Sequence, residues 1–399
     1  MKIKNIRARE ILDSRGNPTL RVYLDTENGE FVAGVPSGAS TGEHEAVELR
    51  DGEERLMGKG VLKAIEIIEN KIAPELKGLK VYHQKKIDQK LLNLDGTDNK
   101  SELGANSILG VSIAACKAGA FYSGMPLYEY IGELSETDPT LPRPLFNVIN
   151  GGSHTGGGVD FQEFMISPQK GSFKDNYFRA TEIYHQLGES LRSKNPAWKN
   201  IGDEGGYVPE LETPEEVLSI IKDLAEVDIV LDVAATEFFE DGFYKMKTGE
   251  KDKKEMIDYY KKLTDKFPII GIEDPLEEND FKGWGELMSE TDKIIIGDDL
   301  LVTNPQRIKT ALKNNSCNGM ILKVNQIGTI TESLEAAKLA KENNWKIVVS
   351  HRSGETTDTF ISDFAVGIAS EFIKSGAPAR GERVAKYNRL LEIEDELNL

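Results

Sequence analysis

The hydrophobic pattern near the start of the chain is that of a β-hairpin. Polar and apolar residues alternate over 19–26, Glu27-Asn28-Gly29 is a turn signal, and apolar residues resume over 31–35. Alternation of this period buries one face of a strand and exposes the other. The chain is therefore expected to begin with strands.

Helical periodicity follows these strands. Apolar residues recur at helical spacing over 61–72, and a second long helical segment covers 106–122. Strands followed by helices predict a smaller α+β domain, which we place at residues 1–134. The Pro-rich segment 138–144 marks the boundary to a second domain, placed at 140–399.

Beyond that boundary, short apolar runs alternate with helical stretches. One helix start is well marked, because Thr213 is a capping residue, Pro214 takes the first helical position and Glu216 completes a capping box. Each apolar run has about the length of a buried strand. Strands that alternate with helices imply a parallel sheet.

Six of these apolar runs end in a charged or titratable side chain. The residues at or directly after the run ends are Asp232, Glu273, Asp298, Lys323, His351 with Arg352, and Lys374. In an open doubly wound sheet, ligands gather at one switch point and few strand ends need such residues. In a closed barrel all strand ends converge on one mouth, where active sites lie. A single charge can simply mark a strand that meets solvent, but six in series favour the α/β class with a (β/α)8-type barrel.

Composition adds that the chain is an ordinary globular protein of two or three domains, since 39% of its 399 residues are hydrophobic and 29% are charged. Residues 1–15 contain no apolar stretch like that of a signal peptide. The weakly polar segment 108–122 is interrupted by Lys117 and is shorter than the ~20 residues that span a bilayer. Cys116 and Cys317 lie outside any metal-ligand spacing, which indicates free thiols. We expect a cytoplasmic protein with no membrane partner.

The net charge of −18 argues against nucleic acid or an anionic membrane as the main partner. An anionic substrate would need local cations that reverse the field at its binding site. His351, Arg352, Ser353 and Lys374 supply cations and hydrogen-bond donors for a phosphate or a carboxylate.

Asp232, Glu273 and Asp298 are carboxylates at successive strand ends, and without a cation they would repel one another until one took up a proton. A hard divalent ion removes that repulsion, and ligation by oxygen alone favours Mg²⁺ or Mn²⁺ over Zn²⁺. Lys323 follows on the next strand and would lie near that metal ion. A positive neighbour and partial burial would lower its pKa, which makes Lys323 a candidate general base.

An acid is also needed to help expel a leaving group. The candidates are Glu163, in Phe161-Gln-Glu-Phe-Met165, and Glu204, in Gly202-Asp-Glu-Gly-Gly206. The segment 35–42 consists mostly of small residues with flanking glycines, which suits a mobile loop that closes over a ligand. An ordinary surface turn would have the same composition.

A series of short motifs runs along nearly the whole chain. The motifs are Asp13-Ser-Arg-Gly-Asn-Pro-Thr19, Pro36-Ser-Gly-Ala-Ser-Thr-Gly42, Asn150-Gly-Gly-Ser-His154, Gly202-Asp-Glu-Gly-Gly206, Leu231-Asp232, Ile272-Glu-Asp-Pro275, Gly297-Asp-Asp-Leu300, Leu322-Lys-Val-Asn-Gln326, Ser350-His-Arg-Ser-Gly-Glu355 and Ala379-Arg-Gly-Glu-Arg-Val-Ala-Lys-Tyr-Asn388. In identity and order they resemble those of the enolase family. This resemblance implies a C-terminal enolase barrel preceded by a smaller α+β domain. It also implies an enzyme of glycolysis and gluconeogenesis that interconverts 2-phosphoglycerate and phosphoenolpyruvate.

The resemblance further implies two Mg²⁺ ions in each active site, with Mn²⁺ as a possible substitute. Asp232, Glu273 and Asp298 are similar to the ligands of the first ion. Ser40, in the small-residue loop, is similar to the ligand that helps to capture the second ion together with the substrate. By the same resemblance, we expect a homodimer or a ring of dimers.

Catalytic roles follow from the resemblance as well. Lys323 is similar to the base that takes the proton from C2, and Glu204, helped by Glu163, to the acid that protonates the departing C3 hydroxyl. The residues implied to line the pocket or to bind substrate are His154 and His351 in the wall, Arg352 and Ser353 at the phosphate, and Lys374 at the carboxylate. His351 is counted with the catalytic residues, and Glu163 and Ser40 also with those that bind substrate.

Two alternatives stay open. Acid-sugar dehydratases and racemases on the same type of barrel share the three metal carboxylates, but they generally lack the pairing of the motif at 202–206 with that at 350–353. A catalytically silent paralogue that serves as a binding or structural protein would show damage at a catalytic position. The acids and lysines at those positions are all intact here.

Overall fold

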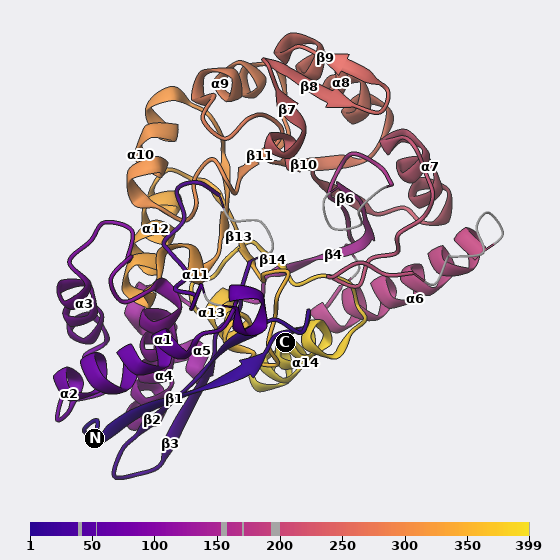
Figure 1. Cartoon of the computed structure of the whole chain (residues 1–399). Helices are drawn as coiled ribbons and strands as arrows, with labels where there is room; N and C mark the ends of the chain where they lie inside the picture. The colour runs from indigo at the N-terminus through magenta and orange to yellow at the C-terminus, as the bar shows by residue number, and fades with distance from the viewer. Residues whose placement is uncertain (39–41, 53, 153–157, 170, 193–199, 399) are drawn as a thin grey trace.

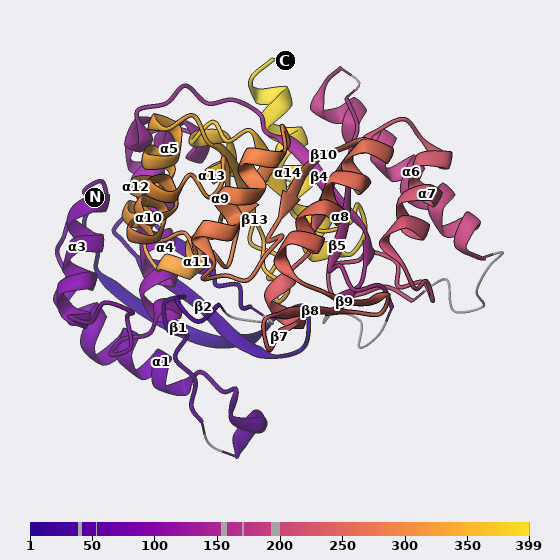
Figure 2. The ribbon, with the colours of Figure 1, turned by 90° about the horizontal axis from the view of Figure 1, so that it is seen from above.

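The computed structural model describes residues 1–398 apart from 39–41, 53, 153–157, 170 and 193–199. The N-terminal part is a three-stranded sheet with helices, and the rest of the chain is a closed barrel surrounded by helices (Figure 1). A view turned by 90° shows the N-terminal sheet and helices along one side of the barrel (Figure 2).

The N-terminal sheet is antiparallel, with the order β1-β2-β3. The strands β2 (Pro18–Asp25) and β3 (Glu30–Gly34) confirm the predicted hairpin. Strand β1 (Asn5–Leu12) was not indicated by the pattern. Only Ile6 of this strand is buried, so the strand carries almost no hydrophobic period that could reveal it.

Helices cover this sheet and confirm the predicted helical segments. Their bounds are α1 (Leu62–Ile67), α2 (Ala73–Leu76), α3 (Gln84–Asp95), α4 (Ala105–Ser123) and α5 (Leu127–Ser135), with η1 (Arg55–Gly58) before α1 and the π-helical η2 (Ile68–Ile72) between α1 and α2. Helix α4 lies very close to β2, because a Cβ added at Gly110 would stand 2.4 Å from Val22 Cγ2. Glycine at this position lets the two backbones approach.

Eight strands close the barrel in the order β4-β5-β6-β10-β11-β12-β13-β14. Their bounds are β4 (Arg143–Asn150), β5 (Glu163–Ser167), β6 (Asp228–Asp232), β10 (Ile269–Glu273), β11 (Ile294–Gly297), β12 (Gly319–Leu322), β13 (Lys346–Ser350) and β14 (Phe372–Lys374). The predicted α/β barrel is confirmed, with one difference. Strand β5 runs antiparallel to both of its neighbours, while the other pairs are parallel.

The helices of the second part ring this barrel. Their bounds are α6 (Phe173–Arg192), α7 (Pro214–Leu224), α8 (Lys253–Lys266), α9 (Phe281–Glu290), α10 (Pro305–Asn314), α11 (Val324–Ile327), α12 (Ile330–Glu342), α13 (Phe360–Gly367) and α14 (Gly381–Glu396), and a small sheet of β7 (Phe239–Glu240), β8 (Phe243–Met246) and β9 (Gly249–Lys251) follows η4 (Ala235–Phe238). The predicted capping box starts α7. Glu216 N donates to Thr213 Oγ1 at 3.3 Å, and Thr213 N donates to the Glu216 carboxylate at 3.1 Å.

A separate hydrophobic cluster fills the inside of the barrel. Its buried members come from seven different strands and are Leu145, Met165, Val230, Ile296, Ile321, Val348 and Phe372. Side chains alternate along each strand, so the neighbours of these residues point outward into the larger core beneath the helices. The filled interior leaves only the ends of the barrel for polar chemistry.

Buried polar contacts join the N-terminal part to the barrel. Lys117 Nζ of α4 lies 2.7 Å from Asp358 Oδ2, and Thr331 Oγ1 of α12 donates to Asp88 Oδ2 of α3 at 2.6 Å. Among the described helices, none is by itself long and apolar enough to cross a membrane. Helices α4 and α5 meet that test only as a pair bent by 101°.

Candidate active site

The predicted charged residues gather at one mouth of the barrel. Asp232, Glu273 and Lys374 end β6, β10 and β14, while Asp298, Lys323 and His351 directly follow β11, β12 and β13. A cavity of about 510 Å³ at this mouth is lined almost entirely by polar and charged side chains. A larger groove of about 1760 Å³ runs along α3, but it is lined mainly by lysine, glutamine and aromatic side chains. The carboxylates therefore identify the mouth as the candidate site.

Glu163 reaches this mouth from the opposite chain direction. It is the first residue of β5, and antiparallel pairing places it opposite Asp232 of β6 and Asn150 of β4. Burial raises the pKa of Glu163 well above its ordinary value, and the nearby charge of Glu204 raises it further. Both effects favour the protonated carboxyl group, which is the form that donates a proton.

Lys374 lies among three buried carboxylates. Its Nζ donates to Asp232 Oδ2 at 3.0 Å and to the two Glu273 oxygens at 2.8 and 2.9 Å, and it lies 3.2 Å from Glu163 Oε1. Burial disfavours the charge of Lys374, but the attraction of these carboxylates outweighs it, and its pKa is raised well above the ordinary value. A charged ammonium therefore holds the three acids together.

The predicted metal ligands Asp232, Glu273 and Asp298 offer donors of the type that a hard divalent cation prefers. Asp232 and Glu273 are register partners on adjacent parallel strands. Burial raises the pKa of Glu273 well above its ordinary value, and the charges of Asp232 and Asp298 raise it further. This repulsion shows that the group has more negative than positive charge. A donor set made only of carboxylate oxygens suits Mg²⁺.

Asp298 is tied to Lys323. The two side chains form a buried ion pair, and Gln326 Nε2 donates to Asp298 Oδ1 at 2.8 Å. Burial favours a neutral Asp298, but the charge and hydrogen bond of Lys323 together with the charge of Lys374 outweigh it and lower the pKa of the carboxyl group. Burial likewise disfavours the charge of Lys323, but the attraction of its carboxylate neighbours Asp298 and Glu273 outweighs it and raises the pKa of the lysine. The lowered pKa predicted for Lys323 assumed a divalent ion beside it, so it stays a prediction for the metal-bound protein.

A second carboxylate group adjoins Asp298. Asp274, Asp298 and Asp299 each place an oxygen within 4.8 Å of the others. Asp274 accepts hydrogen bonds from the backbone N–H groups of Asp298 and Asp299 at 2.9 and 2.8 Å, so it fixes the turn after β11. Burial, with the charge of Asp298, raises the pKa of Asp299 to about 8. Asp232, Glu273 and Asp298 do not all lie within 4.8 Å of one another, so they do not form a group of this kind among the described residues.

Glu204 lies in a polar group with His351. Its carboxylate accepts hydrogen bonds from Asn147 Nδ2 at 3.1 Å and from Ser353 Oγ at 3.2 Å, and His351 Nε2 lies 3.6 Å from its Oε2. Glu163, Glu204 and His351 also place one polar atom each within 4.8 Å of the others. The two candidate acids are therefore neighbours in one buried group.

Arg383 of α14 fixes the tautomer of His351. Arg383 Nη1 lies 2.6 Å from His351 Nδ1, and a guanidinium group only donates, so Nδ1 accepts and the ring proton is on Nε2. Burial lowers the pKa of His351 to about 3, with Glu204 opposing this shift and Arg383 adding to it. The imidazole is neutral at pH 7, and its Nε2–H faces Glu204.

Arg352 is paired with a residue from the N-terminal part. Its Nη1 lies 2.8 Å from Glu45 Oε2, its Nη2 donates to Glu45 Oε1 at 3.2 Å, and its Nη1 donates to Asn325 Oδ1 at 3.1 Å. Both members of the ion pair are buried. An anion that binds to Arg352 would take the place of the Glu45 carboxylate.

Two predicted site residues, Ser40 and His154, lie outside the described residues. Their roles stay predictions, as do the roles of the residues that the structure brings together. Several polar residues of the mouth were not predicted. Gln326, Asp274 and Arg383 belong to motifs that could have drawn attention to them, whereas Glu45 makes a contact that no local pattern indicates.

Fold and site together define an α/β-barrel protein whose mouth carries carboxylates able to bind a metal ion. Residues 3–131 match the family described as enolase, N-terminal domain. Residues 138–399 match that described as enolase, C-terminal TIM barrel domain. The chain therefore belongs to the enolase family. The exact boundaries predicted for its two domains stay a prediction.

Proposed function

We propose that this protein interconverts 2-phosphoglycerate and phosphoenolpyruvate by reversible loss of water. The observation that carries this proposal is the pairing of a buried lysine with a buried acid group at one mouth. Lys323 at the end of β12 is the base candidate, and Glu204 beside Glu163 is the acid candidate. Proton removal at one carbon and protonation of a leaving group at the next carbon need such a pair.

In the dehydration direction, unprotonated Lys323 accepts the proton from C2 of the substrate. Protonated Glu204, with Glu163 beside it, gives a proton to the C3 hydroxyl group while the C3–O bond breaks and water leaves. The electron pair of the C2–H bond forms the new double bond. The neutral His351 keeps its Nε2–H directed at Glu204 and so favours the carboxylate that remains after proton donation.

The resident cation belongs with Asp232, Glu273 and Asp298. A divalent ion held there would neutralise the carboxylates that keep Lys323 protonated and would stabilise the negative charge that develops on the substrate carboxylate. The positive side chains Arg352 and Lys374 supply the remaining attraction for a phosphate and a carboxylate. A divalent ion would add the positive charge that this mouth needs, because its acidic side chains outnumber its lysine and arginine side chains.

The test follows the absorbance of phosphoenolpyruvate after purified protein is mixed with 2-phosphoglycerate and Mg²⁺. Turnover is expected with Mg²⁺ and is expected to stop when a chelator is added. Lys323→Ala is expected to abolish turnover while the protein stays folded and still binds substrate. Lys346→Ala is the matched control, because Lys346 begins β13 at the other end of the barrel and pairs only loosely with Glu371, at 3.4 Å.

Full activity of Lys323→Ala would refute the assignment of the base. Absence of turnover in folded, metal-loaded wild-type protein would refute the proposed reaction and favour a catalytically silent family member. Turnover of sugar acids in its place would favour the related dehydratases. Assembly into dimers or rings of dimers, and the choice between Mg²⁺ and Mn²⁺, stay predictions.

A further inference from the structure

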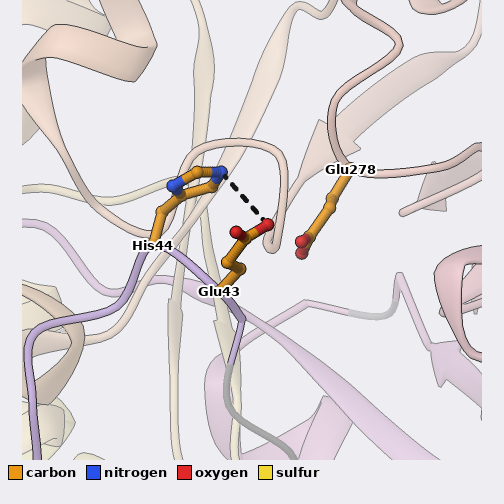
Figure 3. A group of neighbouring side chains, drawn as sticks. All are labelled: Glu43, His44 and Glu278. Carbon is orange, nitrogen blue, oxygen red and sulfur yellow. Dashed lines mark ion pairs between the residues drawn. The ribbon is translucent and has the colours of Figure 1, made fainter.

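A group of metal-binding side chains lies outside the residues assigned to catalysis. Glu43 and His44 belong to the segment between β3 and η1, and Glu278 belongs to the loop between β10 and α9. Each residue places one possible ligand atom within 4.8 Å of the other two. Figure 3 shows the carboxylate of Glu278 directed toward Glu43, with His44 on the other side of Glu43.

Glu278 is the unusual member of this group. The residue is only 7% exposed, yet among the described residues no side chain donates a hydrogen bond to its carboxylate or forms an ion pair with it. Its backbone is held on both sides, because Glu278 N donates to Thr236 Oγ1 at 3.1 Å and Arg307 Nη2 donates to Glu278 O at 2.7 Å. The fixed backbone directs a carboxylate that has no hydrogen-bond partner among the described residues at Glu43 and His44.

An unpartnered carboxylate in this setting is costly. Burial raises the pKa of Glu278, with His44 opposing this shift. Arg307 does not satisfy the carboxylate, since its guanidinium group donates to the backbone oxygens of Glu278 and Leu300. A cation placed between the three side chains would supply the missing partner.

We propose that Glu43, His44 and Glu278 form a binding site for a divalent transition-metal ion of the Zn²⁺ type. One imidazole nitrogen and two carboxylates are a donor set that Zn²⁺ accepts at about 2.0–2.2 Å, with a fourth position left for water. The imidazole separates this site from Asp232, Glu273 and Asp298, which offer oxygen donors only and suit Mg²⁺. Glu43 is 73% exposed at its side chain, so it can rotate to complete the coordination.

The neighbours of the imidazole are compatible with this assignment. His44 Nε2 lies 3.1 Å from Asn279 Oδ1 and 3.9 Å from Glu43 Oε2. Both contacts involve the same ring nitrogen, so an ion bound at Nε2 would take the place of the Asn279 contact. Because the ligands come from the N-terminal part and from a barrel loop, an ion at this site would link two segments more than 230 positions apart in the chain.

The test is a calorimetric titration of the purified full chain with Zn²⁺ in the presence of excess Mg²⁺. Wild-type protein is expected to show one class of Zn²⁺ site that is weakened at least tenfold in Glu278→Gln and in His44→Gln. Glu277→Gln is the matched control, because it removes the same charge from the neighbouring residue, whose carboxylate accepts from Asn279. The Glu277→Gln protein is expected to bind Zn²⁺ with the affinity of the wild type.

Thermal melting supplies a second readout. Zn²⁺ is expected to raise the melting temperature of the wild type and of Glu277→Gln more than that of Glu278→Gln. Glu278→Gln is expected to fold normally without Zn²⁺, since its carboxylate has no partner to lose. An identical Zn²⁺ isotherm in all four proteins, or an undiminished site in either Glu278→Gln or His44→Gln, would overturn the assignment.

Discussion

Lys374→Met isolates the contribution of the ammonium group that lies among three buried carboxylates. Methionine has a similar length and no charge, so the substitution leaves Asp232, Glu273 and Glu163 in place without their shared cation. At about 3 Å and an effective dielectric constant of about 20, each pair attracts by roughly 5 kcal/mol before desolvation is subtracted. Removal of one partner from a buried ion pair costs about 3–5 kcal/mol net.

This loss of unfolding free energy can be converted into a decrease in melting temperature. An unfolding entropy of about 2.1 cal/mol/K per residue gives roughly 0.8 kcal/mol/K for a chain of 399 residues. Lys374→Met is therefore expected to melt about 4–6 °C below the wild type in the absence of divalent ions. Added Mg²⁺ is expected to raise the melting temperature of the variant more than that of the wild type. In the variant, the repulsion among the carboxylates is no longer neutralised by Lys374, and Mg²⁺ can replace its charge.

Lys386→Met is the control for this experiment. Lys386 is fully buried and lies 2.7 Å from Glu355 Oε2, so its removal also breaks a buried ion pair. Its partner is a single carboxylate, and Mg²⁺ is expected to restore none of the lost stability. The reasoning fails if Lys374→Met melts like the wild type without divalent ions, or if Mg²⁺ stabilises the two variants equally.

Three further predictions concern single side chains. His351→Gln is expected to flatten the pH dependence of stability. Because the pKa of His351 falls from 6.5 to about 3 on folding, its contribution is complete above pH 6.5 and is lost as the pH falls toward 3, by about 1.4 kcal/mol per pH unit. Urea unfolding at several pH values measures this slope, and an unchanged slope would contradict the assignment. Glu45→Gln is expected to lower KM for 2-phosphoglycerate because it releases Arg352, and a raised KM would argue that Glu45 positions the arginine instead. Thr213→Ala is expected to cost about 1 kcal/mol of unfolding free energy through loss of the cap, with no change in kcat.

The strand ends were predictable from sequence because two signals coincide there. A buried strand is a short apolar run, and a charged residue at its end marks the point where it leaves the core. In a parallel barrel such ends share one mouth, so the order of the apolar runs is enough to place Asp232, Glu273 and Lys374 together. The hairpin and the cap of α7 were predictable for the same reason, since each is encoded within a few residues.

The direction of β5 was not predictable in this way. Its residues form an apolar run like those of the other strands, and an apolar run has no direction. Pairing with β4 and β6 decides it, and this pairing depends on the whole sheet. As a result, Glu163 reaches the mouth from the first residue of a strand. A search for charged residues at the ends of apolar runs therefore cannot find it.

The pKa of Lys323 shows a second limit of local patterns. Burial by itself lowers the pKa of a lysine. The attraction of Asp298 and Glu273 depends on how neighbouring strands align at their ends, and it raises the pKa of Lys323 when no metal ion neutralises these carboxylates. Contacts between segments far apart in the chain therefore decide electrostatic properties that residue types alone leave open.

The pair of Arg352 and Glu45 shows how such a contact can serve binding. Both side chains are buried, so the free protein has already removed water from the arginine that an anion would use. A phosphate that replaces Glu45 exchanges one carboxylate for another anion at the same guanidinium group, and the cost of burying Arg352 does not arise again. A Glu45 side chain displaced in this way would lose its buried partner. The proposed binding of an anion at Arg352 would thereby depend on the N-terminal segment that carries Glu45.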